Sequence, residues 1–95
     1  MLAMTASAAA AVKSLISALG LRGEAGLRIT ATRRPGDGYR LELTPSAEPG
    51  ANDRVVRGGD AVVFVDPPAS SALEDALLDA RIQAGEVRFV FRARD

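Results

Sequence analysis

The sequence predicts an α+β fold, a compact β-rich domain in which an N-terminal helix and one short helix pack on mixed β-sheets. Two periodicities predict it. Apolar residues recur at helical spacing near the N-terminus, and from Gly26 onward they alternate with polar residues in short runs separated by turn residues. A chain of 95 residues has the length of one small domain, so we expect a single domain over residues 1–95.

The N-terminal helix is predicted to run from Thr5 to Leu19. Thr5 can cap its start, and Gly20 can end it in a left-handed conformation. A helix this short is marginal in water when isolated, so its apolar stripe should pack on a sheet. The stripe consists of Ala8, Val12, Leu15, Ile16 and Leu19.

The segment "GLRITATRRPGDGYRLELT", residues 26–44, predicts a β-hairpin with its turn centred on Gly36. In that register the apolar residues of the two strands face each other, and so do the polar ones, which fixes the pairing. The predicted pairs are Ala31 with Leu41, Ile29 with Leu43, and Thr30 with Glu42, and Arg28 lies diagonal to Glu42.

A second pair of strands is predicted around Gly58 and Gly59, after a surface loop from Thr44 to Asp53 that is rich in Pro, Gly, Ser and Asn. The unbroken apolar run "AVVFV", residues 61–65, is typical of a strand that lies centrally in its sheet or is covered on both faces.

The last third of the sequence predicts a short helix and a closing pair of strands. Ser70 or Ser71 can cap a helix over residues 72–76, and Asp66, before two prolines, has a turn or capping role. "LLDARIQ" and "EVRFVFRA" alternate in polarity and are separated by Ala84 and Gly85, as in a hairpin. Their Phe residues are expected in the core.

Composition excludes several classes of function. The sequence contains neither Cys nor His, so it has no disulfide, thiolate nucleophile, zinc site of the usual kind or imidazole base. We therefore expect that the protein is not an enzyme and binds no metal and no cofactor. The carboxylates that could hold iron through oxygen are scattered along the sequence: Glu48, Asp53, Glu74, Asp75 and Asp79.

Charge and hydropathy also restrict the partners. Lys and Arg together number 12, as do Asp and Glu, and this balance predicts no nucleic-acid partner and no membrane partner. The N-terminal segment lacks the basic region of a signal peptide, and Lys13 interrupts its apolar run, so the sequence predicts a cytoplasmic protein.

The order of several short motifs resembles the HesB/IscA-like A-type iron–sulfur cluster assembly domains over nearly the whole sequence. The motifs are "GLRI" at 26–29, "YRLEL" at 39–43, Glu48, Pro49 and Asp53, Gly59, "VDP" at 65–67, Leu73, "LD" at 78–79 and Phe89 with Phe91. The resemblance implies a compact β-rich fold with a few helices on mixed sheets. It also implies a role connected with iron–sulfur clusters or iron.

The cysteines of that family have no counterpart here. The family carries one Cys in the turn of its first hairpin and a Cys-x-Cys pair after its Phe-x-Phe; Arg34 lies nearest the first position, and the pair is missing. A guanidinium has no lone pair to offer a metal, so no cluster-binding residue can be transferred to this sequence.

Two hypotheses of different classes follow. The first is a non-catalytic accessory or regulatory protein linked to iron–sulfur cluster biogenesis that binds no cluster itself; its partner would be a protein with an acidic surface, and a homo-oligomer is compatible with it. The alternative is a small binding module for an anion or metabolite that has left the pathway. The candidate interaction surface consists of Arg33, Arg34, Asp37, Arg92 and Arg94. The alternative for these residues is an ordinary solvent-exposed surface with no partner.

Overall fold

The structure, a computed structural model, describes residues 1–36 and 38–94. Along the chain its elements are β1 (Ala3–Met4), α1 (Ala6–Ala18), β2 (Gly26–Arg33), β3 (Tyr39–Ser46), β4 (Arg54–Gly58), β5 (Ala61–Val65), α2 (Pro67–Ala72), β6 (Ala76–Gln83) and β7 (Glu86–Ala93).

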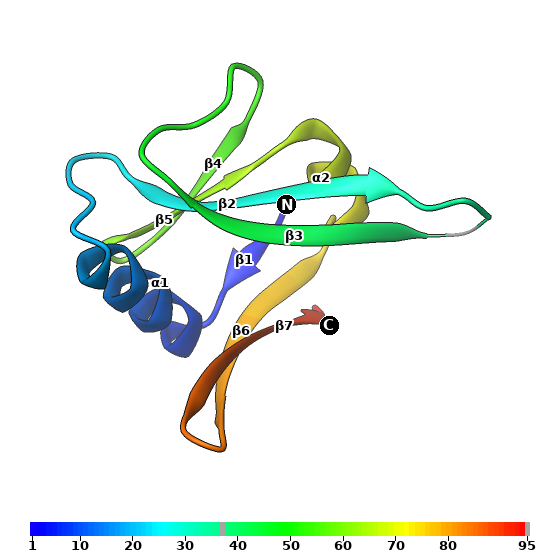
Figure 1. The fold of residues 1–95 in the computed structure, drawn as a ribbon. Helices are drawn as coiled ribbons and strands as arrows, with labels where there is room; N and C mark the ends of the chain where they lie inside the picture. The colour runs from blue at the N-terminus through cyan, green and yellow to red at the C-terminus, as the bar shows by residue number, and fades with distance from the viewer. Residues whose placement is uncertain (37, 95) are drawn as a thin grey trace.

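The strands form two sheets with parallel and antiparallel pairs in each, as the predicted α+β class requires. One sheet has the order β3-β2-β5-β4 and the other the order β1-β6-β7. The β2–β5 and β1–β6 pairs are parallel, and the other pairs are antiparallel. Figure 1 shows two hairpins, β2–β3 and β6–β7, that extend from the body of the molecule in different directions.

Helix α1 begins and ends where its capping residues predict. The Thr5 hydroxyl accepts a hydrogen bond of 3.0 Å from the Ala8 amide, and Gly20 follows the helix with a φ of 72°. Ala8 and Val12 are fully buried, and Leu15 and Ile16 are half-buried against the core. The prediction for Leu19 was wrong. Its side chain is 54% exposed because the helix ends at Ala18.

The β2–β3 hairpin has the predicted register. Ala31 pairs with Leu41, Ile29 with Leu43, and Thr30 with Glu42. Along β2 the residues that face the core are buried, because this strand has β3 on one side and β5 on the other. The matching face of β3 is only half-buried, as expected for a strand at the edge of its sheet.

The β4–β5 hairpin is also present, but its turn is displaced by one residue from the prediction. Gly58 pairs with Ala61, so Gly59 and Asp60 form the turn. Gly58 belongs to β4 and lies close to Met4, since a Cβ atom there would come within 2.8 Å of the Met4 Cγ. Strand β5 lies between β2 and β4, which confirms its central position.

The short helix α2 begins five residues before the predicted start. Asp66 is its N-cap and accepts a hydrogen bond of 2.9 Å from the Ala69 amide, which confirms the capping role considered for Asp66. Ser70 and Ser71 lie inside the helix and do not cap it. Pro67 and Pro68 are tolerated because the amides of the first helical turn have no partner within the helix.

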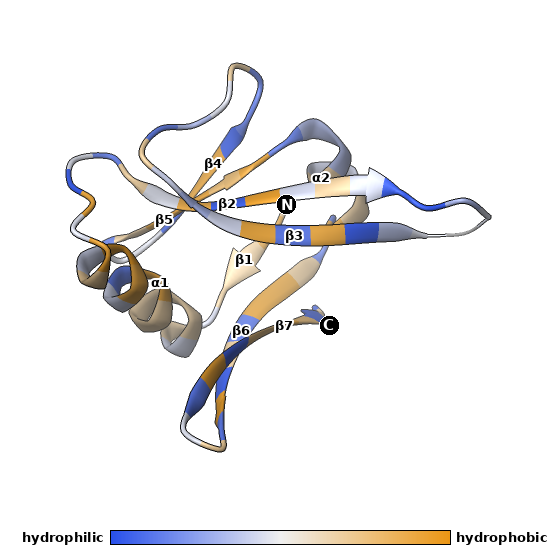
Figure 2. Ribbon diagram, in the orientation of Figure 1, coloured by the Kyte–Doolittle hydropathy of each residue, from blue (hydrophilic) through white to orange (hydrophobic). Residues whose placement is uncertain are grey.

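The closing hairpin β6–β7 pairs Gln83 with Glu86 across Ala84 and Gly85, as predicted. Strand β1 was not predicted; its two residues pair with Leu77 and Leu78 of β6. Figure 2 shows the resulting alternation of apolar and polar residues along β6 and β7.

The core fills the space between the two sheets and α1. Its fully buried side chains come from α1, β2, β5, α2 and β6, so one apolar cluster connects both sheets. Phe64 is buried, whereas Phe89 and Phe91 are half-buried against this cluster. None of the helices in residues 1–36 and 38–94 is long and apolar enough to cross a membrane.

Candidate functional site

The tip of the β2–β3 hairpin carries the first half of the candidate surface. Strand β2 ends at Arg33, and the Arg34 amide donates a hydrogen bond of 3.1 Å to the Gly38 carbonyl oxygen. Gly36 and Gly38 have φ values of 92° and 83°, which side chains rarely adopt, so this turn requires glycine there. Asp37 lies outside the described residues.

Three arginines gather at this tip. Arg33, Arg34 and Arg40 are exposed, and with Thr32 and Pro35 they line a shallow cavity of about 430 Å³. Arg40 joins them because it pairs with Thr32 across the hairpin. We call Arg33, Arg34 and Arg40 the cationic tip; Figure 2 shows the hydrophilic stretch at the end of this hairpin.

The cationic tip carries a net positive charge. Residues 32–40 contain three arginines and one acidic residue, Asp37. None of the ion pairs formed among residues 1–36 and 38–94 includes Arg33, Arg34 or Arg40. Planar guanidinium groups on a protruding turn suit the two-point recognition of carboxylate or phosphate oxygens.

The second half of the candidate surface, at the C-terminal end, is engaged within the chain. An Arg92 Nη2 atom lies 3.3 Å from an Asp79 Oδ2 atom. The Arg94 guanidinium donates to the Met1 carbonyl oxygen at 3.2 Å, and the Arg94 amide donates to the Asp75 carbonyl oxygen at 2.9 Å. These arginines therefore connect the end of β7 to other parts of the chain.

Within one chain the two halves are apart. In Figure 1 the β2–β3 tip extends away from the C-terminal end, which lies beside the body of the molecule. None of the hydrogen bonds or ion pairs between described residues joins the two regions. The structure thus brings Arg33, Arg34 and Arg40 together and separates them from Arg92 and Arg94.

Asp79 is the most contacted carboxylate near the C-terminal end. Its Oδ1 atom accepts hydrogen bonds from the Thr5 hydroxyl at 2.7 Å and from the Ala80 amide at 2.9 Å. The Thr5 hydroxyl, the Ala80 amide and the nearby Arg92 together hold the pKa of Asp79 below its usual value. Thr5 therefore links the start of α1 to β6.

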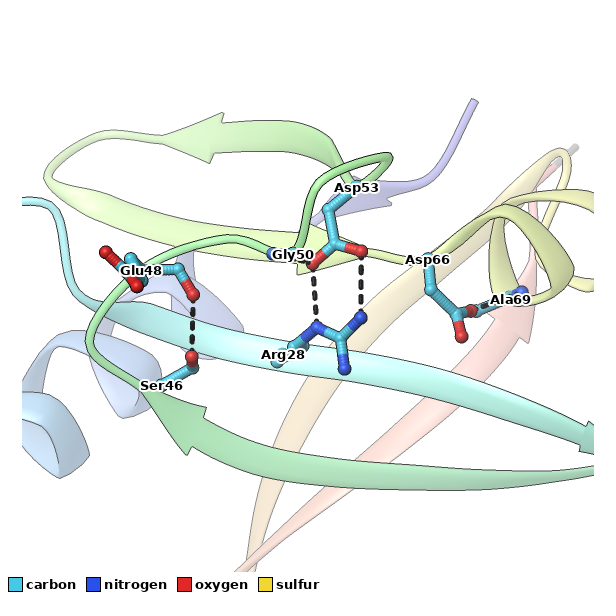
Figure 3. Close-up of polar contacts among 7 residues, drawn as sticks. All are labelled: Arg28, Ser46, Glu48, Gly50, Asp53, Asp66 and Ala69. Atoms are coloured by element: carbon cyan, nitrogen blue, oxygen red, sulfur yellow. Dashed lines mark hydrogen bonds and ion pairs between the residues drawn. The ribbon is translucent and has the colours of Figure 1, made fainter.

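A second carboxylate, Asp53, is fastened to β2 by Arg28 (Figure 3). The Arg28 Nε atom lies 2.7 Å from Oδ2 and its Nη2 atom 3.0 Å from Oδ1, and the Gly50 amide donates to Oδ2 at 2.7 Å. The hydrogen bond from Arg28 lowers the pKa of Asp53, and the same bond raises the pKa of Arg28. The sequence showed both residues but no signal that they form a pair.

This Arg28–Asp53 pair is structural. The Asp53 side chain is only 1% exposed, and both of its oxygens accept hydrogen bonds. A Cβ atom at Gly50 would lie 2.8 Å from the Arg28 Nη2 atom, so glycine is needed for this close approach. The carboxylate is satisfied and covered, which leaves it unsuited to acid–base work or metal binding.

The donors of this chain do not fit an iron–sulfur cluster or a metal ion. The sequence has no thiolate and no imidazole, and among the described residues no three Asp or Glu side chains lie close enough together to hold a metal. The scattered carboxylates Glu48, Asp53, Glu74, Asp75 and Asp79 thus form no such group there. At the hairpin turn, guanidinium groups would repel a cation.

An apolar groove of about 890 Å³ lies between α1 and the β6–β7 hairpin. The α1 side presents small residues, and the hairpin side presents larger apolar ones. Its lining includes Ala10, Ala11, Leu15, Ile82, Val87 and Phe89. The sequence predicted the alternation of this hairpin but not that its apolar face would remain partly open.

No protein-family model matches this sequence, and no curated protein matches it. Solved structures do match the fold. SufA of Escherichia coli, involved in the biosynthesis of iron–sulfur clusters, aligns with a TM-score of 0.81 and 22% sequence identity over 96% of this chain and 78% of its own.

IscA, in a structure with the [2Fe–2S] cluster, aligns with a TM-score of 0.79 and 22% identity over 98% of this chain and 85% of its own. Both alignments cover almost all of this chain, including both sheets and both helices. The chain therefore has the IscA-like fold that the order of its short motifs implied, in a form that contains no cysteine.

Proposed function

We propose that this chain is a non-catalytic accessory or regulatory protein linked to iron–sulfur cluster biogenesis, which binds no cluster and docks an acidic surface of a partner protein on its cationic tip. The observation that carries the proposal is the gathering of Arg33, Arg34 and Arg40 around one shallow cavity on a protruding turn. The fold shared with SufA and IscA supports the link to the pathway.

The absence of Cys and His from the sequence supports a role in binding over one in catalysis or cluster transfer. General-base catalysis and cluster ligation both need a lone pair that is free near neutral pH; thiolates and imidazoles supply one, and guanidinium groups do not. An arginine-rich turn instead recognises anions. Because its contacts are exposed, each contributes little, and binding should weaken as salt rises.

The experiment is a titration of the protein with a fluorescein-labelled polyglutamate peptide at low and high salt. Arg33→Glu/Arg34→Glu should abolish the salt-sensitive binding, whereas the control Arg54→Glu/Arg57→Glu should retain it. The control changes the charge equally on exposed residues of β4 in the same sheet. Equal binding by both double variants would overturn the assignment of the surface.

The link to the pathway needs a separate test. Purified iron–sulfur assembly proteins can be titrated against this chain and its Arg33→Glu/Arg34→Glu variant. Tip-dependent binding to an assembly protein supports the proposal. If the cationic tip binds polyglutamate but no assembly protein binds the chain, the anion-binding surface is correct and the proposed link to the pathway is wrong.

The alternative is a small-anion module, which the cavity among the three arginines favours. Inorganic phosphate and citrate are suitable probes, since their oxygens match guanidinium geometry. Saturable shifts of the amides of residues 32–34, 36 and 38–40 in NMR spectra, lost in Arg33→Glu/Arg34→Glu, would favour this function over protein docking.

A further inference from the structure

The apolar groove between α1 and the β6–β7 hairpin has the size of a small-molecule site. Its volume of about 890 Å³ lies within the range of about 300–1,000 Å³ that such sites occupy. One wall is α1, and the other is the face of the hairpin that carries Ile82, Val87 and Phe89. The groove shares no lining residue with the cationic tip, so it is separate from the surface used in the proposed function.

Large apolar side chains of the hairpin face small side chains of the helix across this groove. Ile82 is 78% exposed and Val87 is 53% exposed. On α1, Ser7, Ala10 and Ser14 line the groove and are exposed as well, with side chains that extend little from the helix. A ligand lying between the walls would remove the apolar surface of Ile82 and Val87 from water, which is favourable in proportion to the area covered.

A hydrocarbon chain fits this space better than a helix of a partner protein does. A helix with its side chains is about 10–12 Å across, so a volume of about 890 Å³ holds only about two turns of it, and a helix that short is marginal in water. An unbranched hydrocarbon chain is much narrower. It also needs no hydrogen bonds, which suits walls whose side chains are mostly apolar.

The charge at the groove indicates the other end of such a ligand. Within the described chain, the lining contains one charged residue, Arg81, and no Asp or Glu. Arg81 reaches the groove from the edge of β6, which β1 leaves uncovered beyond Leu78. Its side chain is exposed, and the long flexible stem allows the guanidinium to turn toward the rim. A negative charge is therefore complementary to this rim.

A second arginine lies beside Arg81. Arg88 pairs directly with Arg81 across the hairpin, so both side chains project from the same face, and like charges in this arrangement destabilise a strand pair. None of the ion pairs formed in the described part of the chain includes either of them. The nearby carboxylate of Asp79 is already held by Arg92 and by the Thr5 hydroxyl. An anion bound beside the two arginines would offset their repulsion.

We propose that this groove binds a free fatty acid, with its hydrocarbon chain between α1 and the hairpin and its carboxylate at Arg81. The hydrocarbon chain lies against Leu15 and the small residues of α1 on one side and against Val87 and Phe89 on the other. The carboxylate accepts hydrogen bonds from the guanidinium of Arg81, and Arg88 adds positive charge beside it. This inference does not depend on the proposed function, because it concerns a different surface.

The first test is a calorimetric titration of the delipidated full chain with octanoate, decanoate and dodecanoate, each below its critical micelle concentration. The dissociation constant should fall about two- to fourfold for each added CH₂ group, since each group leaves water on binding. Decyltrimethylammonium, which has a hydrocarbon chain of the same length and the opposite charge, should bind about tenfold more weakly than decanoate. Affinity that is independent of chain length, or equal for decanoate and this cation, would overturn the proposal.

Filling the groove should prevent binding. Ala10→Phe places a ring in the volume that the hydrocarbon chain needs, so the dissociation constant for decanoate should rise about tenfold or more, as for the loss of about two buried CH₂ groups. The control Ala18→Phe makes the same change at an exposed position of α1 outside the groove and should bind decanoate like the parent. Equal affinities of the two variants would refute the groove as the site. If Ala10→Phe lowers the melting temperature, Ser14→Leu fills the groove from the next turn of the helix and is judged in the same way.

The position of the carboxylate has its own matched pair of variants. Arg81→Gln should weaken decanoate binding about fivefold and should not lower thermal stability, because it removes a like-charge pair. Arg54→Gln makes the same change at an exposed position of β4 and should leave the affinity unchanged. Equal losses of affinity in the two variants would indicate general attraction of the anion by positive charge, and the assigned position would be wrong.

A last set of measurements separates this site from the cationic tip and from a membrane surface. Decanoate should shift the NMR amide signals of residues 7–15 and 80–89; shifts confined to the cationic tip would refute the site. Arg33→Glu/Arg34→Glu should bind decanoate like the parent, and Ala10→Phe should bind polyglutamate like the parent, so either surface can fail without the other. The chain should not sediment with vesicles of phosphatidylglycerol and phosphatidylcholine. Vesicle binding that Ala10→Phe abolishes would make the ligand a membrane surface and overturn the proposal of a free fatty acid.

Discussion

The guanidinium of Arg28, in the middle of β2, holds the carboxylate of Asp53 at two points, with distances of 2.7 and 3.0 Å. Asp53 lies just before β4, so the pair ties the loop over residues 47–53 to the central part of the sheet. Ser46 adds a hydrogen bond of 2.7 Å from its hydroxyl to the Glu48 carbonyl oxygen at the start of this loop.

We expect Asp53→Ala to lower the free energy of unfolding by about 2–3 kcal/mol, because it leaves the Arg28 guanidinium and the Gly50 amide without their acceptor. Thermal unfolding should shift by about 4–8 °C for each kcal/mol lost. The control Glu48→Ala changes an exposed side chain of the same loop and should melt like the parent. Similar melting of the two variants would contradict a structural role for the pair.

Stability should depend on pH through two carboxylates, Asp53 and Asp79. Hydrogen bonds lower the pKa of Asp53 and of Asp79 in the folded chain, so each contributes stability that is present above the unfolded pKa of about 3.9 and lost as the pH falls through the folded pKa. Urea unfolding at a series of pH values should show this loss below about pH 5. Asp53→Asn should flatten the curve there; an unchanged curve would contradict the assignment.

Thr5 should matter at two places at once, because its hydroxyl caps α1 and donates to Asp79. We expect Thr5→Ala to cost about 1–2 kcal/mol in urea unfolding. Thr5→Ser keeps the hydroxyl and should recover most of that stability. Failure of serine to recover it would mean that the methyl group, and not the hydrogen bonds, accounts for the effect.

Three leucines should show a graded effect that follows their burial. Leu27→Ala, in a side chain only 1% exposed, should cost about 2–5 kcal/mol. Leu15→Ala, half-buried on α1, should cost about half as much. Leu19→Ala should cost less than about 0.5 kcal/mol because its side chain is exposed. If Leu15→Ala and Leu19→Ala lowered the free energy of unfolding equally, the assignment of the buried face of α1 would be wrong.

The purified protein should bind no iron–sulfur cluster, since its sequence has no thiolate or imidazole ligand. Anaerobic incubation with ferrous iron and sulfide, followed by desalting, should leave no visible absorbance on the protein. IscA, treated in parallel, is the positive control. Stoichiometric coloured protein would contradict the prediction and with it the proposed function.

Local patterns predicted those parts of the fold that depend on neighbouring residues. The β2–β3 register follows from the alternation of apolar and polar residues on both faces together with a glycine turn. The apolar pair Ile29–Leu43 and the polar pair Thr30–Glu42 both agree with that one register. The capping of α1 by Thr5 is likewise local. Helix α2 begins earlier than predicted because Asp66, and not Ser70 or Ser71, caps it, and because the first helical turn tolerates the two prolines.

Features that depend on distant residues could not be predicted in the same way. Strand β1 has two residues and exists only because Leu77 and Leu78 lie beside it. The Arg28–Asp53 pair joins residues with no shared pattern in the sequence. At the candidate site, the grouping of Arg40 with Arg33 and Arg34 followed from the hairpin register, whereas the positions of Arg92 and Arg94 depended on the arrangement of the two sheets.

The contact between β1 and β6 also bears on the order in which the chain folds. The hairpins β2–β3, β4–β5 and β6–β7 each close a short loop, whereas the Thr5 hydroxyl reaches an Asp79 that lies 74 residues away along the chain. Closing so long a loop costs more chain entropy, which only the assembled core can offset. Docking of β1 and the start of α1 on β6 therefore closes a much longer loop than any of these hairpins does, and we expect it to follow them in folding.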